Sequence, residues 1–169
     1  QARAVRLAAM MAKDEQYTAK EIVACVQQLV DRTTAYFIVD DLNNLQRGGR
    51  LSAGAALVGS MLKIKPILTF EEKKIVALEK IRTQQTAMKR IEQIFEEDTQ
   101  TTDGDGYELV IIHANAPEAG EAWRAQIQEK YPKLRTSLAY FGPVIGTHLG
   151  EGALGCSWDI VVEKNLEMI

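Results

Sequence analysis

The sequence has few cysteines and histidines and no long apolar run, and each shortage argues against a class of protein. Its 169 residues include two cysteines and two histidines. Cys25 and Cys156 lie far apart and match no metal-binding spacing, so we expect reduced, buried thiols and a cytoplasmic protein. The two histidines have no acidic residues at metal-binding spacing around them, which argues against a metal site. No apolar run approaches the ~18 residues of a membrane span, so we expect no stable membrane insertion.

The sequence also lacks a block of charge of one sign. Twenty basic residues are interleaved with 23 acidic ones, for a net charge of −3 and a pI near 5.5. A nucleic-acid surface usually needs a concentrated basic patch, so this balance argues against nucleic-acid binding. What the chain does have is apolar material: 46% of its residues are hydrophobic, enough for the core of one ordinary domain with or without an appendage.

The first 33 residues have the pattern of two helices. Apolar residues recur at helical spacing in "QARAVRLAAMMAKD" and again in "YTAKEIVACVQQLVDRT". The second segment opens with Thr18 followed three residues later by Glu21, which predicts a capping box. We expect a domain boundary near Thr33, with residues 1–33 as helices that precede the main domain.

Residues 34–169 alternate between strand and helix patterns. Six short runs rich in apolar and β-branched residues predict strands, namely "AYFIVD", "KPILTF", "KIVALEKI", "YELVIIHA", "TSLAYFG" and "LGCSWDIVV". Two amphipathic helices are predicted at "TQQTAMKRIEQIFEED" and "PEAGEAWRAQIQEKY", a short one at "DLNNLQRGG", and another from Ser52. The pattern predicts an α/β fold: a two-layer domain with a mixed six-stranded sheet and helices on one side.

The stretch "FGPVIGTHLGEGALG" concentrates five of the twelve glycines around His148. We interpret it as a glycine-rich connection that lets a ligand approach the backbone closely, with Gly146 and the Thr147 hydroxyl beside the imidazole. An imidazole can donate a hydrogen bond to a carboxylate. The alternative is that the glycines form bulges and His148 is a structural histidine.

A second candidate is the loop "LQRGGRLSAG". Gly48 and Gly49 permit a sharp turn between Arg47 and Arg50, which predicts a cationic corner for an anion or an acidic partner. The alternative is a helix C-cap followed by a tight connection. Its spacing does not match a nucleotide-binding phosphate loop.

Arg82 follows a predicted strand and precedes a helix, a junction where α/β sheets often form ligand crevices. An ordinary surface arginine is the alternative. His113 ends an apolar strand with nothing nearby to complete a catalytic set, and no nucleophile elbow is present. We therefore assign no catalytic residue, no metal and no cofactor.

Three blocks together resemble the DegV family. They are "FIVDDLNNLQRGGRLSAGAALVGSMLKIKPIL", "KIRTQQTAMKRI" and "GPVIGTHLGEGALG", in this order. The resemblance covers essentially the whole chain and identifies it as the C-terminal portion of such a protein. By this resemblance, residues 1–33 are the end of an N-terminal domain and residues 34–169 form the C-terminal α/β domain.

The resemblance implies a bacterial, non-catalytic protein that binds a long-chain fatty acid in an apolar tunnel. It is similar to the fatty-acid-binding subunit of fatty acid kinase, which presents the carboxylate to a separate ATP-binding subunit. In the family, the histidine matched by His148 contacts the carboxylate. The arginine matched by Arg82 lies near the head group or the kinase contact, and Arg47 and Arg50 match a positioning or docking block.

The acyl tunnel also has candidate wall residues in this sequence: Leu57, Met61 and Leu62, on the helix expected from Ser52. The alternative is that these three residues are ordinary core residues. The chain departs from the family at Leu149 and Glu151, where many relatives have threonine and proline, and it lacks the N-terminal hydroxyl-bearing blocks.

Two other functions stay open on the sequence. One is an enzyme that uses His148 as acid or base on a phosphorylated small molecule. The other is a regulatory domain whose arginine corner binds protein.

Overall fold

The structure is a computed structural model that describes residues 2–14, 16–49, 64–72 and 74–161. The chain divides into two compact units, residues 1–33 with 159–169, and residues 34–158. The assignment of residues 1–33 to the end of a further N-terminal domain stays a prediction. Among the described residues, no helix combines the length and apolar character needed to cross a bilayer.

The first unit contains helices α1 (Ala2–Lys13) and α2 (Ala19–Arg32). Their buried side chains form a small core of their own, with Leu7, Met11 and Leu29 at its centre. The capping box is confirmed: the Thr18 hydroxyl accepts from the Glu21 amide, and the Glu21 carboxylate accepts from the Thr18 amide at 2.7 Å. These reciprocal bonds satisfy two helix-end amides and fix where α2 begins.

The second unit is built on the six predicted strands, all of which are confirmed. They are β1 (Thr34–Ile38), β2 (Ile67–Glu71), β3 (Lys74–Glu79), β4 (Tyr107–His113), β5 (Arg135–Tyr140) and β6 (Leu154–Ile160). The sheet has the order β3-β2-β1-β6-β4-β5. β1 is antiparallel to both β2 and β6, whereas β4 and β5 are parallel. The mixed six-stranded α/β fold is therefore as predicted.

The strand registers place several chain connections at one edge of the sheet. Ile38, at the end of β1, pairs with Ile67 and with Leu154, and Ile67 in turn pairs with Glu79 at the end of β3. β4 and β5 also end at this edge, where His113 pairs with Tyr140 and the Ala114 amide donates to the Ala153 carbonyl. The helices that follow β1, β3, β4 and β5 along the chain all begin at this edge of the sheet. In α/β sheets such an edge is where ligand crevices form.

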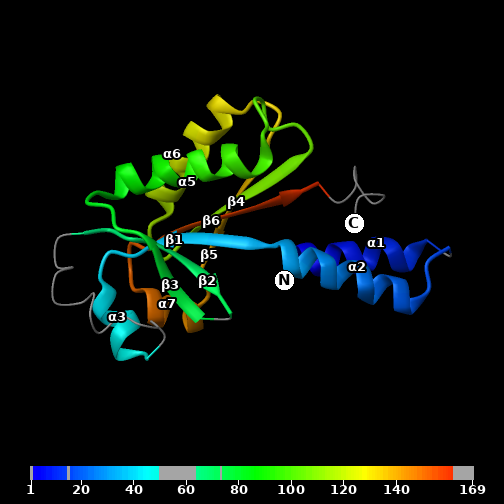
Figure 1. Ribbon diagram of the computed structural model, residues 1–169, viewed down its shortest axis with the longest axis horizontal. Coiled ribbons are helices and arrows are strands. Elements are labelled where there is room, and N and C mark those ends of the chain that lie inside the picture. Colours follow the sequence, from blue (N-terminus) through cyan, green and yellow to red (C-terminus); the bar gives the residue numbers. More distant parts are fainter. Residues whose placement is uncertain (1, 15, 50–63, 73, 162–169) are drawn as a thin grey trace. The chain divides into compact units, whose positions relative to one another are not determined.

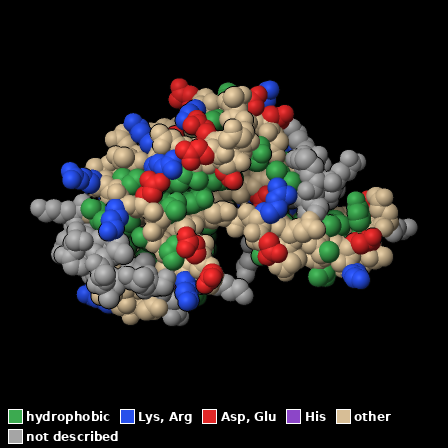
Figure 2. Space-filling model, in the orientation of Figure 1, with side chains coloured by type: hydrophobic (Ala, Val, Ile, Leu, Met, Phe, Trp, Pro, Cys, Tyr) green, Lys and Arg blue, Asp and Glu red, His purple; other side chains and the backbone are tan. Residues whose placement is uncertain are grey.

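Two long helices cover one face of the sheet: α5 (Gln84–Thr99) and α6 (Pro117–Lys130) (Figure 1). Their apolar stripes and the inward residues of the strands form the main core, including Ile91, Phe95, Trp123 and Ile127. The parallel β4–α6–β5 connection requires a crossover helix of this kind. Figure 2 shows basic and acidic side chains interspersed over the part that carries these helices.

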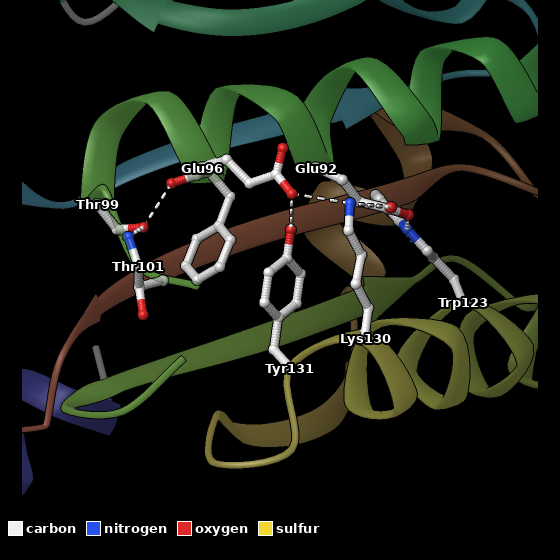
Figure 3. Close-up of polar contacts among 8 residues, drawn as sticks. Glu92, Glu96, Thr99, Thr101, Trp123, Lys130 and Tyr131 are labelled. Carbon is white, nitrogen blue, oxygen red and sulfur yellow. Dashed lines mark hydrogen bonds and ion pairs between the residues drawn. The ribbon is translucent and has the colours of Figure 1, made fainter. Parts of the chain in front are cut away.

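Polar contacts tie α5 to α6 at the rim of this core (Figure 3). The Tyr131 hydroxyl donates to Glu96 at 2.6 Å, and the Lys130 ammonium lies 2.9 Å from the same carboxylate. The Trp123 indole donates to Glu92 at 3.1 Å. Burial and then the Glu96 bond raise the pKa of Tyr131 to about 12, while the bonds from Tyr131 and Lys130 lower the pKa of Glu96.

Strand alternation points the other set of side chains to the opposite face, where two short helices pack. They are α3 (Leu42–Arg47) and α7 (Pro143–Leu149) (Figure 1). A second cluster joins them to the sheet through Phe37, Val39 and Leu68. Both long helices lie on one side, as predicted, and these two short helices are added on the other. The helix predicted from Ser52 lies outside the described residues.

The glycine-rich stretch was predicted as an irregular connection, and that prediction was wrong, because its first half is α7. Pro143 occupies the first turn, where its missing N–H and fixed φ suit a helix start. Gly150 ends the helix at φ 80° and ψ 166°, a conformation that essentially only glycine adopts. Gly146 lies inside the helix, where its amide donates to the Gly142 carbonyl. One proline and one terminal glycine thus outweigh the low helix propensity of the interior glycine.

Candidate functional site

A cavity of about 430 Å³ lies within the second unit, between the face of the sheet that lacks the long helices and α7. Strands β1, β2, β3, β4 and β6 contribute to its lining, with α7 on the other side. The lining residues are Ala35, Tyr36, Phe37, Phe70, Ile75, Ile112, Phe141, Val144, Ile145, His148, Leu149, Gly155 and Cys156. Its volume falls in the range typical of small-molecule sites.

The lining is almost entirely apolar. Among the described residues that form it, His148 is the only side chain of the histidine, lysine, arginine or acidic type. Three lining side chains are large, hydrophobic and well exposed: Phe70 (53%), Val144 (75%) and Ile145 (49%). Single exposed apolar residues are ordinary, but three around one opening form a patch suited to an apolar ligand. Sequence reasoning missed them, although Val144 and Ile145 belong to the block that identified His148.

His148 lies half-buried near the C-terminal end of α7, against the end of α3. A Cβ on Gly48 would stand 2.7 Å from the His148 Nδ1, so only a residue without a side chain lets the imidazole take this position. The structure thus brings Gly48, from the glycine turn after Arg47, against His148, a contact that the sequence did not predict. No protein group in the described part of the chain hydrogen-bonds the imidazole, which leaves its ring nitrogens for a ligand.

Two glycines that follow His148 allow close packing against α3 and the residues just before it. A Cβ on Gly150 would collide with the Asn44 amide, and one on Gly152, at φ 82°, would collide with the Asp40 carboxylate. Asp40 is itself held by Lys65, whose ammonium lies 2.7 Å from its Oδ1. Close packing therefore explains why glycine occupies positions 150 and 152. Only the other glycines of this stretch could serve ligand access.

The other residues predicted beside His148 lie on α7 but outside the cavity lining. The Thr147 hydroxyl donates to the Pro143 carbonyl at 2.7 Å, and Gly146 is half-buried within the helix. Glu151, whose charge would oppose an anion if it pointed inward, is exposed and accepts from the Asn115 amide at 2.7 Å. The His113 Nδ1 accepts from the Ala116 amide, in keeping with a strand-end role.

The predicted arginines lie on the surface. Arg82 is exposed just before Thr83, the N-cap of α5, at the same sheet edge as α7 but outside the cavity lining. Arg47 is exposed at the end of α3, followed by the Gly48 C-cap and by Gly49 at φ 63°. This turn confirms the predicted glycine stop.

Arg50 and the proposed tunnel-wall residues Leu57, Met61 and Leu62 lie outside the described residues. Among the residues that are described, no group of three or more histidine, cysteine or acidic side chains is arranged to hold a metal ion.

Comparison with known proteins finds relatives over most of the chain. A family model described as "Uncharacterised protein, DegV family" matches residues 1–160. A DegV domain-containing protein of Listeria innocua is 52% identical over 141 residues, which are 83% of this chain and 49% of the relative. Protein DegV of Bacillus subtilis is 44% identical over 151 residues, 89% of this chain and 53% of the relative.

Solved structures agree. The crystal structure of DegV, a fatty acid binding protein from Bacillus subtilis, superposes with a TM-score of 0.82 at 42% identity, over 95% of this chain and 56% of that one. A fatty acid binding DegV family protein from Streptococcus agalactiae superposes with a TM-score of 0.77 at 38% identity, over 92% of this chain and 54% of that one. The chain spans about half the length of the relatives it matches. With the family model across 160 of its residues, the chain belongs to the DegV family.

Proposed function

We propose that this domain binds a long-chain fatty acid, with the acyl chain in the cavity beneath α7 and the carboxylate at His148. The observation that carries the proposal is the cavity itself, a largely apolar space whose lining includes one histidine. The Bacillus subtilis relative, at 42% identity and a TM-score of 0.82, is a fatty acid binding protein. The remaining ligands of the carboxylate would come from hydroxyl groups of an N-terminal domain.

The energetics of such a site favour this division between an apolar chamber and a polar end. Each buried methylene contributes about 0.8 kcal/mol, so an acyl chain of roughly 14 methylenes gains on the order of 10 kcal/mol before ordering costs. A carboxylate cannot be buried without hydrogen-bond partners. An imidazole without a partner in the described part of the protein is suited to that task. Leu57, Met61 and Leu62 would complete the tunnel wall.

We assign the chemistry to a separate protein. In this proposal the full-length protein is a non-catalytic subunit that presents the fatty-acid carboxylate to an ATP-binding kinase subunit, which forms the acyl phosphate. Arg82, exposed at the sheet edge shared with α7, is the candidate contact to that partner. The Arg47–Gly48–Gly49–Arg50 corner would position the imidazole from one side and dock the kinase from the other. Thr147 and Gly146 would shape the helix that carries His148.

Native mass spectrometry of the full-length protein tests the binding step. We expect a co-purified fatty acid, and we expect His148→Ala to weaken acyl binding by 10-fold or more, on the order of the ~1.5–3 kcal/mol of a hydrogen bond to a charged group. His113→Ala is the matched control, because His113 lies outside the cavity lining. A protein that binds no acyl chain, or two variants with equal affinity, would overturn the proposal.

Kinase assays test the partnership. Acyl phosphate should form only when the kinase subunit, ATP and the loaded protein are combined, and Arg82→Ala should slow this transfer while the fatty acid stays bound. Turnover by the isolated protein would instead favour an enzyme that uses His148 as acid or base. Capture of the kinase without any dependence on fatty acid would favour a docking domain.

A further inference from the structure

The floor of the cavity contains a position without a side chain. Gly155 lies in β6, near the middle of the sheet order, and pairs with Phe37 of β1. Its neighbour Leu154 belongs to the core under α5 and α6, whereas a Cβ at position 155 would point toward Phe141 and Phe37, which line the cavity. A glycine in a strand interior weakens the strand and often marks a site where another group approaches closely.

The group that approaches Gly155 is the ring of Phe141. A Cβ on Gly155 would stand 2.8 Å from the Phe141 Cζ and 3.6 Å from the Phe37 Cβ. Both Phe141 and Gly155 line the cavity. The Phe141 ring therefore rests directly on the strand backbone and occupies the space that a side chain at position 155 would fill.

The backbone of Phe141 is held in place on both sides. Its amide donates to the His113 carbonyl at 2.8 Å, which extends the parallel pairing of β4 and β5 by one residue. The next residue is the Gly142 N-cap of α7. The backbone is thus held between a strand and a helix start, and only rotation of the side chain changes how far the ring reaches into the cavity.

We infer that Phe141, seated on Gly155, closes one end of the cavity and sets the length of acyl chain that the site accepts. The inference rests on the proposed function and deepens it, since it assigns chain-length selection to this pair. Removing the ring lengthens the apolar space. Adding a methyl group at position 155 displaces the ring into that space, because the methyl group would meet the Cζ atom, the far end of a rotatable side chain, at 2.8 Å.

The two substitutions therefore shift selectivity in opposite directions. The test is competition among saturated fatty acids in two-carbon steps for the full-length protein, read by native mass spectrometry of the bound species. Phe141→Ala should favour longer chains and Gly155→Ala shorter ones. Because each buried methylene changes affinity roughly fourfold, a two-carbon step should change relative occupancy by about 15-fold.

Two neighbouring substitutions are the controls. Tyr140 precedes Phe141 but is 72% exposed and outside the cavity lining, so Tyr140→Ala should leave the length profile unchanged. A Cβ on Gly142 would meet nothing within 4 Å, so Gly142→Ala tests a glycine of the same segment without displacing the ring. Thermal unfolding of each variant checks that the fold is retained.

The possible results distinguish failure of the chain-length inference from failure of the proposed function. Opposite shifts in the two variants, with flat controls, support the inference. If the parent protein binds fatty acids and both variants keep its length profile, Phe141 does not set the length and the inference fails alone. If the parent protein binds no fatty acid, the proposed function fails and the inference fails with it. If Gly155→Ala cannot be purified folded, the profile of Phe141→Ala decides the question.

Discussion

At the scale of single residues, the contact between Gly48 and His148 is the one on which the site depends. A methyl group at position 48 would displace the imidazole, since it would stand 2.7 Å from Nδ1. We predict that Gly48→Ala weakens fatty-acid binding about as much as His148→Ala does. The two effects should not add in the double variant, because the methyl group acts through the imidazole. Titration with a fluorescent fatty acid measures all three, and additive losses would contradict the contact.

Gly150 gives a stability prediction at the same scale. Its backbone, at φ 80° and ψ 166°, is in a region reserved for glycine, and a Cβ would also collide with Asn44. We expect Gly150→Ala to lower the free energy of unfolding by about 1–3 kcal/mol or more. Gly142→Ala, at an ordinary extended conformation, should cost less, about 0.5–1 kcal/mol, for the replacement of glycine by a poorer N-cap residue. Urea denaturation compares the two, and equal losses would show that the conformation at position 150 is not restrictive.

At the scale of elements, the α5–α6 contact predicts a dependence on alkaline pH. The folded protein holds the Tyr131 proton to a pKa of about 12, whereas an unfolded chain releases it near 10. The unfolded state therefore binds fewer protons between these values, and stability falls as pH rises through them. The contribution is fully present below about pH 10.

Tyr131→Phe removes this group and supplies the comparison. Below about pH 9 the variant should be less stable than the parent by about 1–2 kcal/mol, for the lost hydrogen bond to Glu96. The difference should shrink as pH rises toward about 12. Urea denaturation at several alkaline pH values measures it. A difference that stays constant across this range would contradict the raised pKa.

The elements also show what sequence reasoning reached and what it missed. The strands were predictable because each is a compact run of apolar and β-branched residues, as in Tyr107–His113. Helix α7 was not, because the glycine count masked the Pro143 start signal. The cavity was beyond the sequence: Ala35, Phe70 and Ile112 come from three different strands, and nothing local marks them as neighbours. His148 was chosen from its pattern, but its contact with Gly48 is a product of tertiary packing.

At the scale of the whole molecule, the chain supplies one part of the proposed site. It spans about half the length of the relatives that it matches. The second unit contributes the apolar chamber and the imidazole. We therefore expect the affinity of the full-length protein for a fatty acid to depend on both halves of the protein. The position of the acyl chain should depend on the half described by this structure.

Isotope-filtered nuclear Overhauser spectroscopy of the full-length protein with a labelled fatty acid tests that position most directly. We predict cross-peaks from the acyl methylenes to the methyl groups of Ile75, Ile112 and Ile145, which line the cavity. Ile91 and Ile127, in the core beneath the long helices, should give none. A bound fatty acid with no cross-peak to any of the three lining isoleucines would contradict the account.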